Sequence, residues 1–319
     1  MALGEFDLIA RYFTRPTQRA VLGVGDDCAL LAPAPGMQLA VSCDMLVEGR
    51  HFLSTVAPRW LGHKALAVNL SDLAACGAKP LAFTLALALP RADETFLEGF
   101  SCGLLALAEA QGCELIGGDT TQGPLNICVT VFGEVPAGAA LLRSGARAGD
   151  DIYVSGTLGD ARLALEAFRG TAVLSGHAFD AVRVAMEQPQ PRIALGLALR
   201  GVASSAIDVS DGLLGDLAHI LRRSGVGALV EVDAVPRSAC LREQPIAVQR
   251  LCTLSGGDDY ELVFTAAPAA AARVADAARS AGVNTTRIGR IEAAAGQRLV
   301  GAGGREVVHA VASFDHFRA

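Results

Sequence analysis

The sequence predicts an α/β protein made of two successive halves, each mixing helices and strands in an α/β or α+β arrangement. Apolar runs of strand length alternate with segments of helical spacing along most of the chain. This periodicity is lost near residues 137–149, where glycine and alanine dominate. The length of 319 residues also suits two domains. We therefore expect one domain at residues 1–137 and a second at residues 149–319.

Each predicted element of the first half has a local signal. Apolar residues recur at helical spacing from Leu61 to Cys76, and Gly77 is placed to end that helix. The apolar run at 81–89 is enclosed by two prolines and is far shorter than the roughly 20 residues of a membrane-spanning helix. It therefore predicts a buried strand. The first half is expected to contain strands at 39–43, 81–89 and 126–135, and helices at 61–76 and 94–111.

The second half repeats the alternation. Its predicted helices each run into a glycine that is placed to end them. The predicted strands are short and rich in β-branched or aromatic residues. The second half is expected to contain strands at 151–156, 206–209 and 261–265, and helices at 160–169, 212–224 and 268–281.

Composition excludes several classes of function. Hydrophobic residues make up 51% of the chain and charged residues 19%, which favours a compact, well-buried enzyme. The net charge of −6 argues against a nucleic-acid or anionic-membrane surface. The eight cysteines form no C-x-x-C pair, and the N-terminus lacks the apolar core of a signal peptide. We therefore expect reduced thiols and a cytoplasmic location.

Aspartates recur where predicted strands end or where a loop leads into a helix. A single such aspartate is more often a turn or a helix cap than a ligand, but here the pattern is repeated beside several strands. Carboxylates gathered in one crevice require cations, and oxygen ligands without histidine or cysteine clusters select Mg²⁺, which also binds substrate phosphates. The aspartates concerned are Asp26, Asp27, Asp44, Asp72, Asp119, Asp208, Asp211, Asp258 and Asp259.

Familiar phosphate-binding and kinase motifs do not explain this pattern. Cys28 occupies the last glycine position of a G-x-G-x-x-G motif, and lysine occurs only at Lys64 and Lys79, so there is no Walker A loop. No H-R-D motif of protein kinases is present. The pattern itself therefore indicates a site for several metal ions and a polyphosphate.

Taken together, the motifs closely resemble those of the thiamine-monophosphate kinase family, within the superfamily of aminoimidazole ribonucleotide synthetase and selenophosphate synthetase. They occur in the family's order and span nearly the whole chain. The matching stretches are GEFDLIARYF (4–13), GVGDDCALL (23–31), SCDMLVEGRHF (42–52), KALAVNLSDLAACGAKP (64–80), LIGGDTTQGP (115–124), RSGARAGDDIYVSGTLGD (143–160), AIDVSDGLLGDL (206–217), LSGGDDYELVFT (254–265) and FDHF (314–317).

The resemblance implies a fold and a reaction. The fold is a two-domain one like that of aminoimidazole ribonucleotide synthetase, in which N-terminal strands form a barrel across a homodimer. The reaction is ATP-dependent phosphorylation of thiamine monophosphate to thiamine diphosphate, with several Mg²⁺ ions. Because the acceptor is already an ionised phosphate, we expect direct in-line transfer with no covalent nucleophile and no dedicated base.

The resemblance also implies roles for individual residues. Positions that match the family's metal ligands are Asp27, Ser42, Cys43, Asp44, Asp72, Asp119, Asp208 and Asp211. Positions that match its ATP contacts are Gly118, Asp119, Arg143 and Ser210. Positions that match its thiamine-side contacts are His51, Asp258 and Phe314. Asp26 is expected to support the turn, because neighbours in an extended segment point to opposite sides.

Three of these positions depart from the family's pattern. Cys43 replaces a hydroxyl residue, and a neutral thiol binds Mg²⁺ poorly, so its backbone carbonyl is the expected contact. Asp258 is one methylene shorter than the usual glutamate, and Phe314 replaces a larger aromatic residue. Two alternatives remain open: another ATP-dependent small-molecule enzyme of the superfamily, or a non-catalytic module that binds magnesium and nucleotide.

Overall fold

The structure is a computed structural model that describes residues 4–309, 311, 313 and 314. Asp315–Phe317 of the C-terminal FDHF motif therefore lie outside the described residues. The chain divides into two compact units. The N-terminal unit comprises Met1–Leu73 and Ala78–Gly138, and the C-terminal unit comprises Ala74–Gly77 and Ala139–Ala319.

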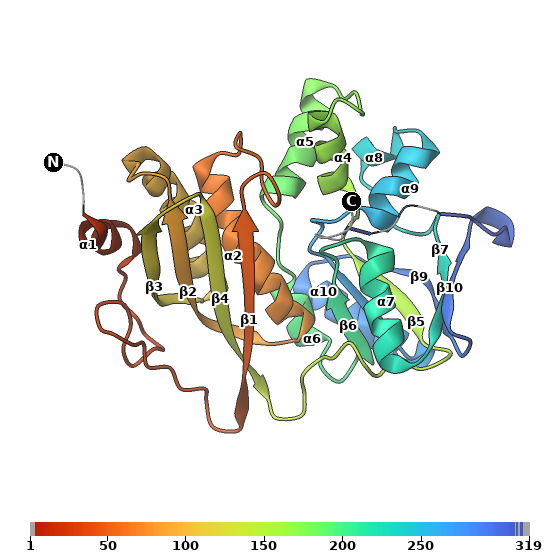
Figure 1. The fold of residues 1–319 in the computed structure, drawn as a ribbon. Helices are drawn as coiled ribbons and strands as arrows, with labels where there is room; N and C mark the ends of the chain where they lie inside the picture. The colour runs from red at the N-terminus through yellow and green to blue at the C-terminus, as the bar shows by residue number, and fades with distance from the viewer. Residues whose placement is uncertain (1–3, 310, 312, 315–319) are drawn as a thin grey trace. The chain divides into compact units, whose positions relative to one another are not determined.

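The N-terminal unit is built on an open four-stranded sheet with strand order β1-β4-β2-β3. The β1–β4 and β4–β2 pairs are antiparallel, and the β2–β3 pair is parallel. Helices α2 and α3 cover one face of this sheet (Figure 1). The elements are α1 (Glu5–Leu8), the π-helix η1 (Ile9–Phe13), β1 (Met37–Val47), α2 (Pro58–Ala75), β2 (Lys79–Leu89), α3 (Glu94–Gln111), β3 (Glu114–Gln122) and β4 (Asn126–Pro136).

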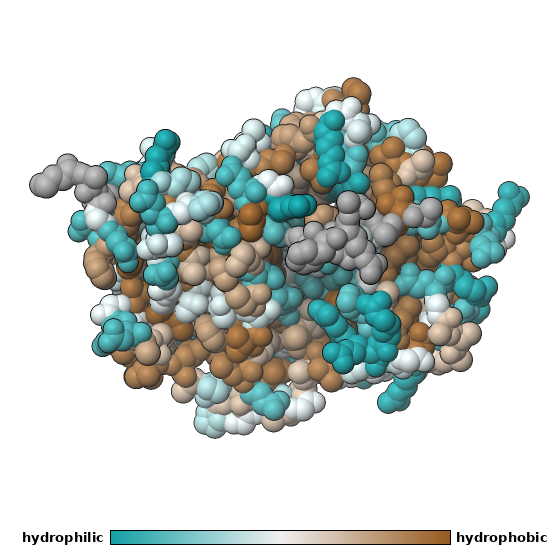
Figure 2. Space-filling model, in the orientation of Figure 1, coloured by the Kyte–Doolittle hydropathy of each residue, from teal (hydrophilic) through white to brown (hydrophobic). Residues whose placement is uncertain are grey.

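The opposite face of this sheet is partly open. Along β1, the side chains of Leu39, Val41 and Met45 are 43%, 56% and 53% exposed, because they alternate with residues that face α2. Figure 2 shows apolar surface, in brown and tan, among the polar patches over the N-terminal sheet. Near β2 and β3, the N-terminal segment around Ala20 and Ala29 packs on this open face instead.

The C-terminal unit is built on a six-stranded sheet with strand order β10-β7-β9-β5-β8-β6. Only its β10–β7 pair is parallel among the pairs described. The elements are β5 (Asp151–Ser155), α4 (Asp160–Phe168), α5 (Gly176–Glu187), α6 (Ile193–Ala198), β6 (Ser205–Asp208), α7 (Leu213–Ser224), β7 (Gly227–Glu231), α8 (Ala239–Arg242), α9 (Ile246–Ser255), β8 (Leu262–Ala266), η2 (Pro268–Ala270), α10 (Ala271–Ala281), β9 (Thr285–Glu292), β10 (Gly296–Val300) and η3 (Ala302–Gly304).

Two apolar clusters hold the C-terminal unit together. The larger one places the apolar side of α7, including Leu213, Leu217 and Ile220, against sheet residues such as Val230 and Ile288. The smaller one joins α4, α5, α8 and α9. Because α7 is packed along its length, the C-terminal end of the loop at residues 209–212 is joined to a fixed helix.

Candidate active site

Strand β1 and helix α2 bring together several of the predicted metal ligands. Ser42 Oγ donates a hydrogen bond to Asp72 Oδ2 at 2.5 Å. The Asp44 N–H donates to Asn69 Oδ1 at 2.9 Å. Asn69 and Asp72 are three residues apart on α2, so both face the strand, as their spacing predicts. Ser42, Asp44 and Asp72 therefore form one polar group between β1 and α2.

The thiol of Cys43 lies on the other side of β1. Its Sγ is 3.4 Å from Sγ of Cys128 on β4, on the open face of the sheet. Ser42 and Asp44, its sequence neighbours, face α2 instead. The Cys43 side chain is therefore directed away from the Ser42 and Asp44 side chains. Its backbone carbonyl lies on β1 between these two residues.

A second group of predicted residues lines a cavity of about 750 Å³ on the open face near β3. Asp27, Gly118 and Asp119 are among its lining residues, and Phe6, Ile9 and Phe13 of the N-terminal helical segment are among its apolar ones. Asp26 Oδ1 accepts the Asp27 N–H at 2.9 Å, which confirms the expectation that Asp26 supports the turn. The cavity thus combines carboxylates, a glycine backbone and an apolar wall.

The predicted metal ligands of the N-terminal unit fall into two groups, one between β1 and α2 and one at the cavity near β3. Asp44 and Asp119 also lie inside strands rather than at strand ends, because β1 continues to Val47 and β3 to Gln122. Strands β1 and β3 are opposite edges of the sheet, so two strands separate the two groups by roughly 14 Å. Among the described residues, no group of three or more His, Cys, Asp or Glu side chains is close enough to hold a metal ion.

His51 lies in a tightly bonded turn after β1. The Val47 N–H donates to His51 Nδ1 at 2.9 Å, which places the proton of the neutral ring on Nε2. Lys64 of α2 is 1% exposed, and its Nζ donates to the His51 carbonyl at 3.1 Å. A buried lysine therefore fixes the backbone of a residue that the family resemblance assigns to the thiamine substrate.

In the C-terminal unit, three predicted residues lie at the end of β6 and in the loop before α7. Asp208 is the last residue of β6, and Ser210 and Asp211 follow before the helix begins at Leu213. One oxygen, Oδ2 of Asp216, accepts the N–H groups of Ser210, Asp211 and Gly212, each at 3.1 Å. Burial and the neighbouring Asp211 carboxylate raise the pKa of Asp216 to about 7, against the effect of these three donors.

The loop that carries Asp258 packs directly on this first loop. The Asp258 N–H donates to the Ser210 carbonyl at 2.9 Å, and the Tyr260 N–H donates to the Val209 carbonyl at 2.8 Å. Asp258 and Tyr260 both have positive φ angles, 67° and 50°, which are strained for residues other than glycine. The Tyr260 hydroxyl donates to Asp258 Oδ1 at 3.1 Å. The loop is thus held in a conformation that fixes the Asp258 carboxylate.

The C-terminal segment brings Phe314 to the same place. The Phe314 N–H donates to the Asp211 carbonyl at 3.1 Å, and Ser313 Oγ accepts the Gly215 N–H at 2.9 Å. Residues assigned to metal, nucleotide and thiamine substrate therefore share one set of backbone hydrogen bonds. The structure brings together Ser210, Asp211, Asp258 and Phe314.

Arg143 lies at the C-terminal end of α7, whereas the group of Ser210, Asp211, Asp258 and Phe314 lies at its N-terminal end. Ser224, the last residue of that helix, donates through Oγ to the Arg143 carbonyl at 3.4 Å. Burial, Arg222 and Arg143 lower the pKa of His219, whereas Asp211 raises it. The backbones of Arg143 and Asp211 lie at opposite ends of α7.

Sequence reasoning missed Asp216 and Lys64. The hydrogen bonds described for each are with backbone atoms, and a residue with that role has no spacing pattern of its own. The available signal for Asp216 was an acidic residue in the first turn of a helix, directly after the S-D-G loop. For Lys64, the signal was a lysine directly before the apolar residues 65–68, in a chain that has only two lysines.

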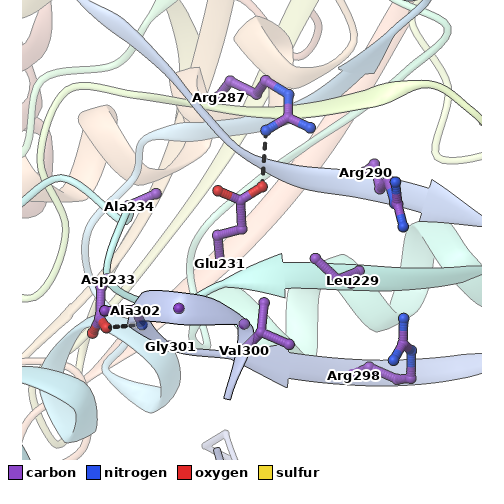
Figure 3. A pocket seen from close by; sticks show the side chains of 12 residues that line it. Leu229, Glu231, Asp233, Ala234, Arg287, Arg290, Arg298, Val300, Gly301 and Ala302 are labelled. Carbon is purple, nitrogen blue, oxygen red and sulfur yellow. Dashed lines mark hydrogen bonds and ion pairs between the residues drawn. The ribbon is translucent and has the colours of Figure 1, made fainter. Parts of the chain in front are cut away.

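A further cavity, of about 510 Å³, lies over β7, β9 and β10 of the C-terminal unit. Arg287 and Glu231 form an ion pair of 2.9 Å at this cavity, and Asp233 accepts the Ala302 N–H at 2.8 Å (Figure 3). Arg298 is paired with Glu292. The described residues that line this cavity include none of the predicted site residues.

Comparison with known proteins identifies the two halves of the chain. Residues 25–135 match the family described as AIR synthase related protein, N-terminal domain, and residues 147–302 match the corresponding C-terminal domain. Over the described residues, no helix has the length and hydropathy required to span a membrane.

Comparison with individual proteins identifies the family more narrowly. The chain is 51% identical over 271 residues to thiamine-monophosphate kinase of Salmonella typhimurium, with 83% of each chain covered. The crystal structure of thiamine-monophosphate kinase from Stenotrophomonas maltophilia K279a matches with a TM-score of 0.85 and 45% identity, covering 96% of this chain and 99% of that one. The structure of AaThiL complexed with AMPPCP and TMP matches with a TM-score of 0.76 and 30% identity, covering 90% and 89%. This chain therefore belongs to the thiamine-monophosphate kinase family of AIR synthase related proteins.

Proposed function

We propose that this protein transfers the γ-phosphoryl group of ATP directly to thiamine monophosphate, forming thiamine diphosphate. The observation that carries the proposal is the shared loop cluster, where backbone hydrogen bonds join Ser210 and Asp211 to Asp258 and Phe314. A relative of 30% identity has been solved with the ATP analogue AMPPCP and TMP, which supports the same pair of ligands here. We propose that residues 1–137 form the domain that binds ATP and magnesium and that forms the dimer. Residues 149–319 form the C-terminal α/β domain.

The proposed metal ions are several Mg²⁺. The donors fit Mg²⁺ because they are carboxylate and hydroxyl oxygens, while the nearby Cys43 thiol is directed away from them. These oxygens would hold the ions together with the substrate phosphates, and bound Mg²⁺ would neutralise phosphate charge during transfer. The proposed ligands are Asp27, Ser42, the Cys43 carbonyl, Asp44, Asp72, Asp119, Asp208 and Asp211.

The remaining site residues bind and orient the two substrates. We assign Gly118, Asp119, Arg143 and Ser210 to the nucleotide, where the Arg143 guanidinium offsets phosphate charge. His51, Asp258 and Phe314 are assigned to thiamine monophosphate. The proton on His51 Nε2 makes that atom a donor for an acceptor on the substrate. The acceptor phosphate is ionised near neutral pH, so the chain needs only to align it with the γ-phosphoryl group.

A direct assay tests this function. Purified protein is incubated with Mg-ATP and thiamine monophosphate, and the products are separated by chromatography. We expect stoichiometric thiamine diphosphate and ADP, with no product when either substrate is omitted. ADP formation without thiamine diphosphate, or nucleotide binding with no turnover, would reject the kinase in favour of one of the two alternatives.

We also propose a homodimer in which the N-terminal sheets of two copies combine into a barrel. Strand β1 is an edge of its sheet, and Leu39, Val41 and Met45 form an exposed apolar row along it. An uncovered edge strand with apolar side chains favours association with another strand. A second copy presents the same row, so the two rows are suited to cover each other.

Val41→Lys should convert this dimer to monomer. The substitution places a charge in the middle of the apolar row, where a partner would have to bury it. Sedimentation velocity should show twice the chain mass for the unsubstituted protein and a single chain mass for the variant. Val173→Lys, at a valine that is 92% exposed in the C-terminal unit, is the matched control and should leave the dimer intact. A dimeric Val41→Lys variant would exclude this interface.

The cytoplasm is the proposed location. All eight cysteines are free thiols in the structure, including Cys43 and Cys128, whose sulfurs are within contact distance. Thiols that remain free at this distance suit a reducing compartment. Cell fractionation that recovers the activity outside the cytosolic fraction would reject this assignment.

A further inference from the structure

Asp216 is a buried acidic residue in the first part of α7, and its side chain is bonded to the loop that precedes the helix. The residue is 4% exposed. Its Oδ2 atom accepts hydrogen bonds from the N–H groups of Ser210, Asp211 and Gly212, all at 3.1 Å. Three consecutive backbone donors thus converge on a single carboxylate oxygen.

The loop depends on this oxygen because it accepts all three of those donors. Gly212 stands at the N-cap position, with φ 122°, and has no side chain that could cap α7. The first N–H groups of a helix and the turn before it need acceptors, and burial makes an unsatisfied donor costly. A carboxylate at the N-terminal end of a helix also interacts favourably with the helix dipole. Asp216 meets these requirements from inside the helix.

The carbonyl groups of the same loop point to other partners. The Ser210 carbonyl accepts the Asp258 N–H at 2.9 Å, and the Asp211 carbonyl accepts the Phe314 N–H at 3.1 Å. Asp216 therefore binds the N–H groups of this loop. The carbonyl groups of the loop in turn bind the two segments that are assigned to the thiamine substrate. A shift of the loop would displace residues on both sides.

We propose that Asp216 is a positioning residue that sets the Ser210–Gly212 loop for Mg-nucleotide binding and, through that loop, aligns Asp258 and Phe314. Only the expected effect of Asp216 on turnover rests on the proposed kinase function. Its effects on loop structure and on nucleotide affinity can be measured without any reaction.

The test compares Asp216→Ala and Asp216→Asn with the unsubstituted full-length protein. Alanine removes the acceptor, whereas asparagine keeps one neutral carbonyl oxygen, which makes weaker hydrogen bonds than a carboxylate. Hydrogen exchange at the amides of residues 210–212 should be at least about tenfold faster with alanine and intermediate with asparagine. Calorimetry with Mg-AMPPCP should show affinity lowered about tenfold with alanine and by less with asparagine.

Asp233→Ala is the matched control. Asp233 also accepts a backbone N–H from a turn of the C-terminal unit, that of Ala302 at 2.8 Å, but beside the other cavity (Figure 3). Its loss should speed exchange at Ala302 and leave Mg-AMPPCP affinity unchanged. A general loss of stability would instead lower the melting temperature of both alanine variants without weakening Mg-AMPPCP binding in either.

Two results would overturn the proposal. One is unchanged amide exchange at residues 210–212 in a folded Asp216→Ala variant. The other is faster exchange combined with the affinity of the unsubstituted protein, which would make Asp216 a purely structural residue. If the alanine variant does not fold, the asparagine variant decides by the same two measurements. Failure of the kinase assay alongside graded Mg-AMPPCP affinities would reject the proposed reaction and leave the role of Asp216 standing.

Discussion

Replacing Asp44 or Asp119 with asparagine is expected to abolish thiamine diphosphate formation, with kcat/KM reduced roughly 10³-fold or more. Asparagine has nearly the same shape but lacks the charge that holds Mg²⁺ beside the phosphates. The fold should persist, because the Asp44 N–H keeps its bond to Asn69 and the Asp119 side chain is exposed. Unfolding temperatures of both variants should stay close to that of the unsubstituted protein.

Asp26→Asn is the control for this experiment. Asp26 lines the same cavity as Asp119, but its Oδ1 accepts the Asp27 N–H, a contact that an asparagine carbonyl can keep. We expect its activity to remain within a few-fold of the unsubstituted protein. Turnover at the unsubstituted level in both the Asp44 and Asp119 variants would exclude the metal assignment.

The pair of variants also separates the two edges of the N-terminal sheet. Asp44 belongs to the group between β1 and α2, whereas Asp119 belongs to the cavity near β3. If metal ions act at both places, each variant should raise the Mg²⁺ concentration needed for half-maximal activity. A change confined to one variant would restrict the metal ions to one edge.

Helices with explicit end signals could be predicted from the sequence. The helix at residues 94–111 has the predicted bounds, because Asp93 accepts the Phe96 N–H at its start and Gly112 adopts φ 60° at its end. Strands β3, β7, β9 and β10 were not predicted. In strand β9 the buried residues Ile288 and Ile291 are three positions apart, because the pairing with β5 is irregular beside Gly289, so the two-residue period of a strand is absent from the sequence.

The membership of the site could be read from motifs, but its arrangement could not. Ser210, Asp211 and Asp258 are brought together by backbone hydrogen bonds, which depend on loop geometry and not on side-chain type. The separation of Asp44 from Asp119 follows from strand order, since β4 and β2 lie between their strands. Neither loop geometry nor strand order is encoded in the local spacing of residues, so the motifs could not show that the N-terminal aspartates fall into two groups.

Gly117 and Gly118 are adjacent in β3 but differ in the space that is available for a side chain. Gly118 has φ 146° and pairs with Leu85 across the β2–β3 ladder. A Cβ atom on Gly118 would overlap the Leu85 carbonyl oxygen and lie 2.6 Å from its carbon and 2.8 Å from the Leu85 nitrogen. All of these are backbone atoms, so no side chain can move aside. At Gly117, the nearest atom would be Thr84 Cγ2 at 3.8 Å, an ordinary contact.

Gly118→Ala is therefore expected to lower the free energy of unfolding by about 3 kcal/mol or more, and the melting temperature by roughly 6 °C or more. To admit the methyl group, β3 must move away from β2, and Asp119 must move with it. Mg-AMPPCP affinity should consequently fall even at temperatures where the variant is folded. Gly117→Ala should change the free energy of unfolding by less than about 1 kcal/mol. Equal melting temperatures and equal affinities for the two variants would show that β3 is not held against β2 at Gly118, and that the position of Asp119 does not depend on that contact.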